Sequence, residues 1–255
     1  MKLSIVIPAF NEEARLRPTL DVYSAFYERL YGNNFEIIVA VNGSVDHTED
    51  VARDVARIHP QVKVVVDPGK IGKGGAILMG FRAAKGDIVG FVDADGSTQP
   101  DAYQDLVEHI GDAGCIIASR WMPGATVSPK QPMPRRIASR IFNSLVRTLF
   151  SVKITDTQCG AKVLSRKALD AVLPRIGLTR WAFDVDLLFQ IRRAGFRIEE
   201  RPTVWHDVGG SRLKVGRAST EMFIAIVRLR LLYSPFKWVV TVYDKTVGRF
   251  IHVTR

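Results

Sequence analysis

Short apolar runs recur along the first half of the chain and constrain its fold more than any other feature. They lie at Leu3–Pro8, Phe35–Val41, Val62–Val66, Asp87–Val92 and Cys115–Ser119. Each run is apolar at nearly every position, whereas a strand with one solvated face alternates apolar and polar residues. Such runs are typical of strands that are buried on both faces. The sequence therefore predicts a parallel sheet with helices covering both sides.

Helical patterns separate these runs, as a parallel sheet requires. We expect helices from Asn11 to about Tyr31, from Asp46 to Ile58, onward from Gly72–Gly75, and over Arg135–Phe150. Alternating strands and helices indicate an α/β fold with a doubly wound, mostly parallel sheet like that of nucleotide-binding folds. A chain of 255 residues has room for one large domain, which we expect over residues 1–216, with helices following over 217–255.

The chain is basic, which predicts an anionic partner. It has 36 Lys and Arg residues against 26 Asp and Glu residues, a net charge of +10. Nucleic acid, a phosphorylated substrate and an acidic membrane surface all fit such a charge. The chain shows neither a helix-turn-helix pattern nor an RNA-binding signature, so we do not expect nucleic acid as the partner.

Cysteine usage and the amino-terminal residues predict a cytoplasmic protein. Cys115 and Cys159 are far apart and lack CxxC spacing, so they indicate neither a disulfide framework nor a zinc site. The opening residues, MKLSIVIPAF, hold an apolar core too short for a signal peptide. No run reaches the roughly 18 apolar residues of a membrane span.

Three clusters of polar residues stand where predicted strands end. They are Pro8–Glu12, Asn42–Asp46 and Asp93–Gly96. Taken singly, each fits a turn or a helix N-cap, because Asn, Asp, Gly and Ser favour those positions. Ligands of open α/β sheets bind beyond the carboxyl ends of the strands, so three clusters at matching positions predict one shared site.

The most informative of these clusters is the pair Asp93 and Asp95. Residues i and i+2 at a strand end point the same way, so the two carboxylates would repel each other unless a cation lay beside them. Oxygen ligands without Cys or His suit Mg²⁺ or Mn²⁺, which bind through one or two carboxylates plus substrate phosphates. The alternative is an Asp-Gly turn with two solvated carboxylates.

Positive groups and backbone N–H groups accompany these acids. The glycine-rich stretch Gly69–Ala76 lies between a strand and a helix, where it can face an anion, although it matches neither GxxxxGK[ST] nor GxGxxG.

The sequence of residues 121–134 predicts a mobile loop able to act as a lid. Arg136, Arg140 and Arg147 share one side of the helix that follows, either as an anion site or as a solvated face.

The motifs, taken together, resemble those of family-2 glycosyltransferases with the GT-A fold. They are VIPAFNEE, VNGSVDHT, GKIGKGGAILMGF, FVDADGS, ASR, DTQCGAKVLSR, WAFDVDLL and the segment WHDVGGSRL. Their order and spacing are most similar to those of the dolichyl-phosphate glucose and mannose synthases, and DTQCG and WAFDV are closer to the glucosyl branch. The resemblance covers about residues 3–232. It implies that 1–216 is a catalytic domain.

The resemblance implies inverting transfer of a hexose, glucose, from a nucleotide sugar, UDP-glucose, to a polyprenyl or dolichyl phosphate with Mg²⁺ or Mn²⁺. The residues that would contact the nucleotide sugar are Pro8, Ala9, Asn11, Glu12, Asn42, Asp46, Lys73, Asp93, Ala94, Asp95, Ser211 and Arg212. Of these, Asp93 and Asp95 would hold the metal, which makes Asp95 a catalytic residue. Arg120, Arg136 and Arg140 would bind the acceptor phosphate or the departing diphosphate.

Two departures and one residue leave alternatives open. Asn42 stands where the family usually has Asp, which weakens the assignment of the nucleobase and leaves GDP-mannose as an alternative donor. Gly96-Ser97 differs from the mannosyl branch, which has a larger residue there. Asp184 could be a general base, an orienting group or a helix N-cap. A saccharide or other hydroxyl acceptor would require it as a base.

The C-terminal residues predict contact with a membrane surface. Met222–Tyr233 is densely apolar, and apolar residues recur at helical spacing over 236–251 with Lys237, Trp238 and Lys245 beside them. Aromatic and basic residues next to an apolar stripe fit a helix lying in the membrane interface. We therefore expect a peripheral protein on the cytoplasmic face of the membrane. The alternative is that these helices pack on the catalytic domain or on a second copy.

Overall fold

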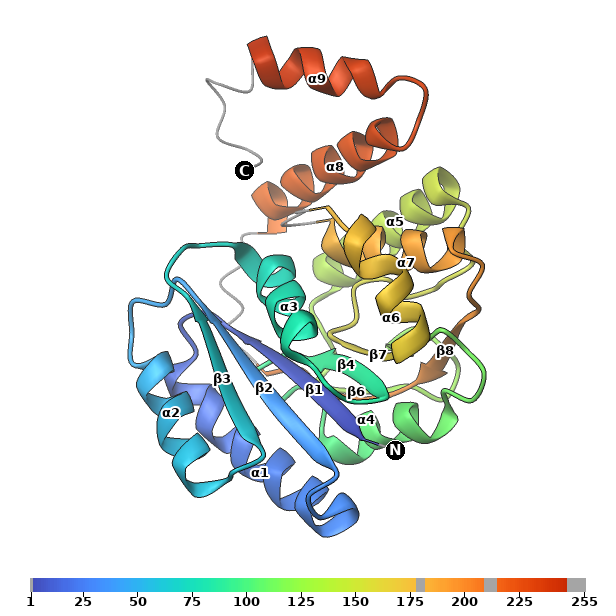
Figure 1. Ribbon diagram of the computed structural model, residues 1–255. Coiled ribbons are helices and arrows are strands. Elements are labelled where there is room, and N and C mark those ends of the chain that lie inside the picture. Colours follow the sequence, from blue (N-terminus) through green and yellow to red (C-terminus); the bar gives the residue numbers. More distant parts are fainter. Residues whose placement is uncertain (1, 178–181, 209–214, 247–255) are drawn as a thin grey trace.

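The computed structural model describes residues 2–177, 182–208 and 215–246 (Figure 1). The strands are β1 (Leu3–Ala9), β2 (Phe35–Asn42), β3 (Val62–Asp67), β4 (Ile88–Val92), β5 (Cys115–Ser119), β6 (Thr126–Ser128), β7 (Ala161–Ser165), β8 (Ile198–Pro202) and β9 (Val204–His206). The helices are α1 (Glu13–Tyr31), α2 (Thr48–Ile58), α3 (Gly72–Ala83), α4 (Pro100–His109), α5 (Met133–Phe150), α6 (Arg166–Val172), α7 (Phe183–Arg193), α8 (Val215–Leu232) and α9 (Lys237–Thr246), with a 3-10 turn at Leu173–Arg175.

Seven strands form one sheet in the order β3-β2-β1-β4-β7-β5-β8. Every neighbouring pair is parallel except the two that involve β7, which runs antiparallel to both β4 and β5. The expected α/β class and mostly parallel sheet are confirmed. The strand β7 was not among the expected ones, because its residues AKVLS lie beyond residue 119, where the regular alternation of apolar runs and helical patterns ends.

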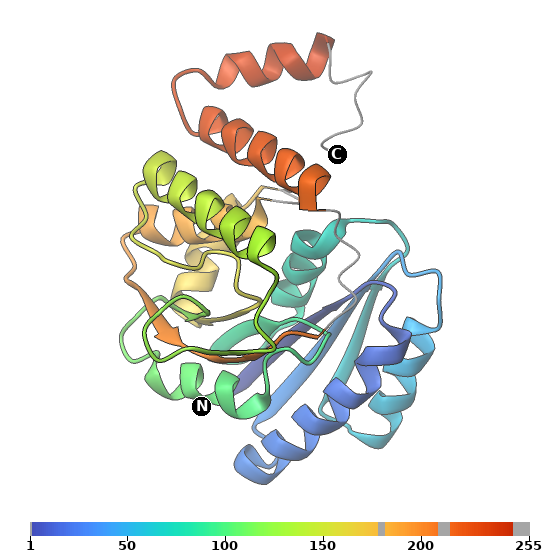
Figure 2. The ribbon, with the colours of Figure 1, turned by 180° about the vertical axis from the view of Figure 1, so that it is seen from behind.

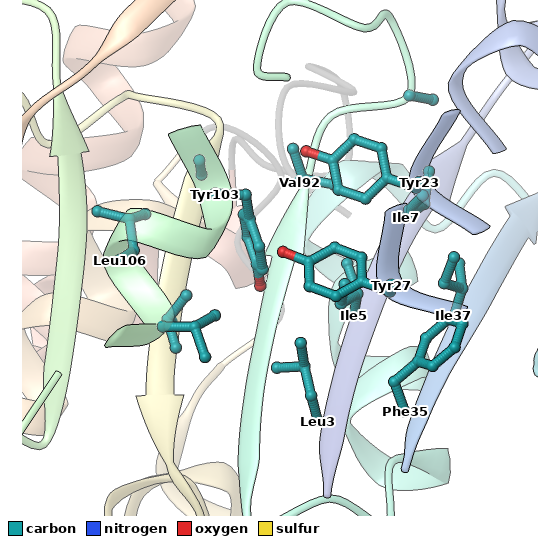
Figure 3. Packing of buried hydrophobic residues seen from close by; sticks show 14 of the residues in the cluster. Leu3, Ile5, Ile7, Tyr23, Tyr27, Phe35, Ile37, Val92, Tyr103 and Leu106 are labelled. Atoms are coloured by element: carbon teal, nitrogen blue, oxygen red, sulfur yellow. The ribbon is translucent and has the colours of Figure 1, made fainter. Parts of the chain in front are cut away.

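Two hydrophobic clusters cover the two faces of the sheet, as the uniformly apolar strands predicted. Tyr23 and Tyr27 of α1 and Tyr103 of α4 lie together in the first cluster, against the side chains of β1 and β4 (Figure 3). The second cluster joins Phe81 of α3 and Phe183 of α7 to Phe91 of β4. The sheet is thus a rigid support that fixes the loops at its edges.

The loop over residues 121–134 contains more order than the sequence predicted. Its residues Thr126–Ser128 form β6, which pairs in parallel with β9 in a separate two-stranded sheet. A strand of three residues leaves no periodic signal, which is why it was missed. The lid movement of this loop stays a prediction.

The helices α8 and α9 lie at one end of the molecule, beyond α5 and α7 (Figures 1 and 2). α8 buries Ala225, Ile226 and Leu229 in the second cluster, so it packs on the core of the preceding domain. It begins at Val215, so the boundary expected after residue 216 falls inside this helix. Residues 247–251 of the C-terminal apolar pattern lie outside the described residues. No helix in the described ranges has the length and apolar composition needed to cross a bilayer.

Candidate active site

The three polar clusters meet in one pocket of about 460 Å³. Its lining residues are Pro8, Phe10, Glu12, Asn42, Lys70, Gly72, Lys73, Asp93, Ala94 and Asp95. They come from the ends of β1, β2 and β4 and from the start of α3, because the parallel strands all end at this edge of the sheet. Seven of the predicted site residues are therefore brought together: Pro8, Glu12, Asn42, Lys73, Asp93, Ala94 and Asp95.

Sequence reasoning missed three lining residues, although each lies inside a motif that it singled out. Phe10 belongs to VIPAFNEE, and Lys70 and Gly72 belong to the glycine-rich stretch. Lys70 Nζ lies 4.9 Å from the centre of the Phe10 ring. The two side chains thus form one wall of the pocket, with an aromatic face and a positive charge.

We call Glu12, Asp93 and Asp95, with Lys73, the acidic pocket. Lys73 Nζ lies 2.5 Å from Asp93 Oδ1, so part of the repulsion expected between the two aspartates is offset by this lysine. Burial raises the pKa of Asp93, the Lys73 ammonium offsets this in part, and Asp95 adds to it. Burial lowers the pKa of Lys73, but the Asp93 carboxylate raises it to about 12. Burial likewise raises the pKa of Glu12, which pairs with Arg15 at 2.7 Å.

The donor set of the acidic pocket fits a divalent metal only with help from a substrate. Asp95 Oδ1 accepts the Ser97 N–H at 3.0 Å, and no hydrogen bond from the described part of the chain reaches Asp95 Oδ2. Among the described residues there is no group of three or more His, Cys, Asp or Glu side chains that could hold an ion. Two carboxylates that leave the remaining positions to phosphate and water suit Mg²⁺ or Mn²⁺.

The antiparallel strand β7 brings Gly160 to the acidic pocket. Because β7 runs opposite to its neighbours, the residues that precede it lie at the edge where the parallel strands end. The Asp93 N–H donates to the Gly160 carbonyl at 3.1 Å. A Cβ atom on residue 160 would lie 2.0 Å from Asp93 Oδ2, which real structures do not tolerate. Any residue other than glycine at this position would force the Asp93 carboxylate to shift.

A second charged group, the arginine clamp of Arg120 and Asp156, lies at the end of β5 on the same edge. Arg120 Nε and Nη2 donate to the two carboxylate oxygens of Asp156 at 2.7 and 2.9 Å, and the Arg120 backbone N–H donates at 3.0 Å. Asp156 is fully buried. Burial raises its pKa, but Arg120 lowers it more, so the pKa lies below the usual range. Sequence reasoning quoted Asp156 in DTQCG without giving it a role.

The arginine clamp is fixed by further contacts. Glu200 of β8 accepts the backbone N–H groups of Thr155 and Asp156 at 2.8 and 3.0 Å. On the other side, the Arg120 guanidinium lies 5.0 Å from the centre of the Trp205 ring. Glu200 and Trp205 were also missed, because their partners lie more than 40 residues away in the sequence.

One arginine of α5, Arg140, contacts Trp121, the residue next to the clamp. Trp121 directly follows Arg120 in the chain, and the Arg140 guanidinium lies 5.2 Å from the centre of the Trp121 ring. Arg136 lies one turn earlier on α5, and its Nη1 donates to the Met133 sulfur at 3.4 Å. The structure thus places Arg140 beside the residue that follows Arg120.

Asp184 is neither exposed nor a helix cap. The N-cap of α7 is Ala182, and Asp184 is the second residue of the helix. Its Oδ1 accepts a hydrogen bond at 2.6 Å from Nζ of Lys162, a fully buried residue of β7. Lys162 was missed by sequence reasoning, and a lysine within the run AKVL was the only signal for it.

Asn42 and two of the remaining predicted residues, Asn11 and Asp46, support the loops around the pocket. Asn42 Nδ2 donates to the Ala9 carbonyl at 3.2 Å. Asn11 has a positive φ of 54° and accepts the Val45 N–H at 2.9 Å. Asp46 Oδ1 accepts the Thr48 N–H at 3.1 Å, at the start of α2. The predicted residues Ser211 and Arg212 lie outside the described residues.

Comparison with known protein families gives one match over most of the chain. The model of the family described as "Glycosyl transferase family 2" matches residues 4–173. A dolichyl-phosphate beta-glucosyltransferase, ALG5C of Trichomonas vaginalis, is 31% identical over 253 residues, which cover 95% of this chain and 74% of the relative. A dolichyl-phosphate beta-glucosyltransferase of Drosophila melanogaster is 35% identical over 227 residues, which cover 84% of this chain and 69% of the relative.

Solved structures confirm the GT-A arrangement of the sheet and helices. Glucosyl-3-phosphoglycerate synthase from Mycobacterium tuberculosis, in complex with Mn²⁺, UDP and glucosyl-3-phosphoglycerate, is similar with a TM-score of 0.66 and 21% sequence identity. The match covers 89% of this chain and 78% of that protein. The UDP complex of the same enzyme gives a TM-score of 0.67 at 20% identity over 92% of this chain and 82% of that protein.

Proposed function

The chain belongs to glycosyl transferase family 2, and on that basis we propose that it transfers glucose from UDP-glucose to dolichyl phosphate or a similar polyprenyl phosphate, with inversion at the anomeric carbon. Relatives that carry the name dolichyl-phosphate beta-glucosyltransferase, at about 30% identity over most of the chain, support this acceptor and sugar. The observation that carries the proposal is that an acidic pocket and an arginine clamp lie at one edge of the same sheet.

The acidic pocket is the proposed donor site. Pro8, Glu12 and Asn42 would face the base and ribose, and Asp93 and Asp95 would hold Mg²⁺ or Mn²⁺ against the diphosphate. When bound, such an ion neutralises the charge that develops on the leaving diphosphate. Lys73 lies at the start of α3, where its ammonium and the backbone N–H groups of the first turn would face the same phosphates.

The arginine clamp is the proposed acceptor site. Asp156 accepts hydrogen bonds from Nε and Nη2 of Arg120. Arg120 Nη1 makes no hydrogen bond within the described residues, so it would be available to a phosphate oxygen. Arg140 and Arg136 of α5 would add positive charge from the side of Trp121. A phosphate acceptor is already ionised near neutral pH, so it needs no general base, and fixed charges would supply most of the rate enhancement.

Transfer assays with the purified full chain test this proposal. We expect glucose transfer from UDP-glucose to a polyprenyl phosphate with Mn²⁺ or Mg²⁺, and loss of transfer with EDTA. GDP-mannose and an alkyl glucoside serve as the competing donor and acceptor. Faster transfer from GDP-mannose, or transfer to the glucoside and not to the lipid phosphate, would overturn the assignment.

We propose in addition that α8 and α9 rest on the membrane that holds the acceptor, at its cytoplasmic face. The observation that supports this is a set of exposed apolar side chains, which include Phe236 and Trp238, exposed to 58% and 60%. Apolar contact of this kind, with basic residues near an anionic surface, gives peripheral binding. The two cysteines, both buried as free thiols, fit a reducing compartment.

Vesicle binding tests the membrane contact. We expect the chain to sediment with phosphatidylserine-containing vesicles, and the variant Trp238→Glu to sediment less. Val22→Glu is the matched control, because Val22 is 47% exposed on α1, which lies away from α8 and α9 (Figure 1). Equal loss in both variants would contradict the proposed contact.

A further inference from the structure

Behind the acidic pocket, four charged side chains of alternating sign follow one another from the surface into the core. Asp93 pairs with Lys73 at 2.5 Å, and Asp184 pairs with Lys162 at 2.6 Å. The two ammonium groups lie 5.7 and 5.2 Å from the centre of one ring, that of Phe91. Asp184 also interacts electrostatically with both Lys73 and Asp93, so the two pairs form one row.

The buried end of this row is costly for the fold. Lys162 is 0% exposed, and its ammonium has two partners, the Asp184 carboxylate and the Cys159 carbonyl at 2.8 Å. A buried ion pair is a weak source of stability, because desolvation opposes the attraction and apolar residues of similar volume often serve as well. A charge retained at this depth therefore needs a reason other than stability.

The Asp184 end of the pair is near two residues that line the pocket, since it interacts electrostatically with Lys73 and Asp93. The Asp184 side chain is 11% exposed, and Oδ1 alone is held by Lys162. No hydrogen bond from the described part of the chain reaches Oδ2. The start of α7 is pressed against the helix that lines the pocket, since a Cβ atom on Gly74 of α3 would lie 2.6 Å from Cβ of Phe183. Asp184 is thus held next to Lys73 by the contact between α3 and α7.

We propose that Lys162 is a positioning residue that fixes Asp184, so that Asp184 Oδ2 accepts a hydrogen bond from a hydroxyl group of the transferred hexose. This inference rests on the proposed function, because the sugar is attached to the diphosphate that Lys73, Asp93 and the metal would hold. A carboxylate accepts hydrogen bonds from hydroxyl groups without any proton transfer. Asp184 then contributes to donor recognition and is not the general base.

Comparing the affinities of UDP and UDP-glucose isolates this contact. In calorimetric titrations with Mn²⁺, we expect Asp184→Asn to lower the affinity for UDP-glucose about tenfold, a typical effect for one hydrogen bond to a charged group. The affinity for UDP should change by less than about twofold. Lys162→Met should weaken UDP-glucose in the same selective way. The variant that combines Lys162→Met and Asp184→Asn should bind UDP-glucose no more weakly than Asp184→Asn alone, since the two changes remove the same interaction.

Two controls keep the test decisive. Lys167→Met makes the same chemical change at an exposed position of α6 and should leave both affinities unchanged. If Lys162→Met does not fold, Lys162→Met with Asp184→Met replaces the whole buried pair by apolar side chains and should fold and bind UDP, with UDP-glucose weakened. If Asp184→Asn lowers the affinities for UDP and UDP-glucose equally, or lowers neither, this inference is overturned and the proposed function is not affected. A wild-type chain that binds neither UDP nor UDP-glucose would overturn the proposed function as well.

Discussion

The acidic pocket and the arginine clamp lie at the same edge of one sheet, but their charges are compensated in different ways. In the acidic pocket the side chains of Lys73 and Asp93 are 38% and 26% exposed, and three carboxylates share the space. In the clamp, Arg120 and Asp156 are 9% and 0% exposed and meet through two parallel hydrogen bonds. The clamp pairs one arginine with one carboxylate, whereas in the pocket Arg15 pairs with Glu12 and Lys73 with Asp93, and Asp95 has no ion-pair partner among the described residues.

The largest expected effect is on stability and tests whether the clamp, which is the proposed acceptor site, contributes more to the stability of the fold than the acidic pocket does. Asp156→Ala would leave Arg120 buried without its partner, which typically costs about 3–5 kcal/mol of the free energy of unfolding. Asp93→Ala should cost much less, because solvent reaches both members of its pair. Urea unfolding of the two variants measures the difference. Equal losses of unfolding free energy in Asp156→Ala and Asp93→Ala would show that the clamp does not stabilise the fold more than the acidic pocket does.

The next effect is on transfer and tests whether the acidic pocket holds the metal ion that the proposed reaction requires. We expect Asp95→Ala to lower the rate of glucose transfer about 10²–10³-fold, which is typical of losing a group that stabilises developing charge. Its thermal unfolding should stay close to that of the wild type. Asp112→Ala is the matched control, because Asp112 is exposed and precedes β5, at the opposite edge of the sheet. Normal transfer by Asp95→Ala would remove the metal-binding role.

A smaller effect connects the pocket to β7. Gly160→Ala would push the Asp93 carboxylate away from the metal position, and misplacement by about 1 Å can lower a rate as much as 10²-fold. We expect a loss of transfer somewhat below that of Asp95→Ala. Transfer kinetics over a range of Mn²⁺ concentrations would show a raised Mn²⁺ requirement. A loss of transfer without any change in that requirement would contradict this explanation.

The smallest effect concerns acid and tests the clamp again. The pKa of Asp156 is lowered in the folded protein, so its contribution to stability is complete above the ordinary carboxyl pKa of 3.8 and is lost as pH falls through the folded value. Unfolding free energies of the wild type should therefore fall in this acidic range more steeply than those of Asp156→Ala. Parallel pH profiles of the two proteins would contradict the expected linkage.

Local patterns predicted most of the fold, since an uninterrupted apolar run such as Phe35–Val41 indicates a strand buried on both faces without knowledge of its neighbours. They failed for β7 and for the three-residue strands β6 and β9, whose pairing partners alone define them. The site followed the same rule. Strand ends predicted six of the pocket residues, because parallel strands end at one edge, and the glycine-rich stretch at the start of α3 accounted for the seventh, Lys73.

Partners across the fold could not be predicted in this way. Asp156 and Arg120 are 36 residues apart in the sequence, and Lys162 and Asp184 are 22 residues apart. Each pair is created by the packing of β7 and its flanking segments against β4, β5 and α7. Nothing in the spacing of these residues along the chain indicates that they meet.

The pairing of Phe91 with Lys162 also determines how β7 can enter the sheet. Adjacent residues of a strand point to opposite faces, so a slip of one position would turn the lysine toward Tyr103 and the tyrosine-rich cluster of α1 and α4, away from Asp184. A misaligned strand would then carry an isolated positive charge into an apolar layer. The same side chain that we place behind the sugar would thus also disfavour wrong strand alignments.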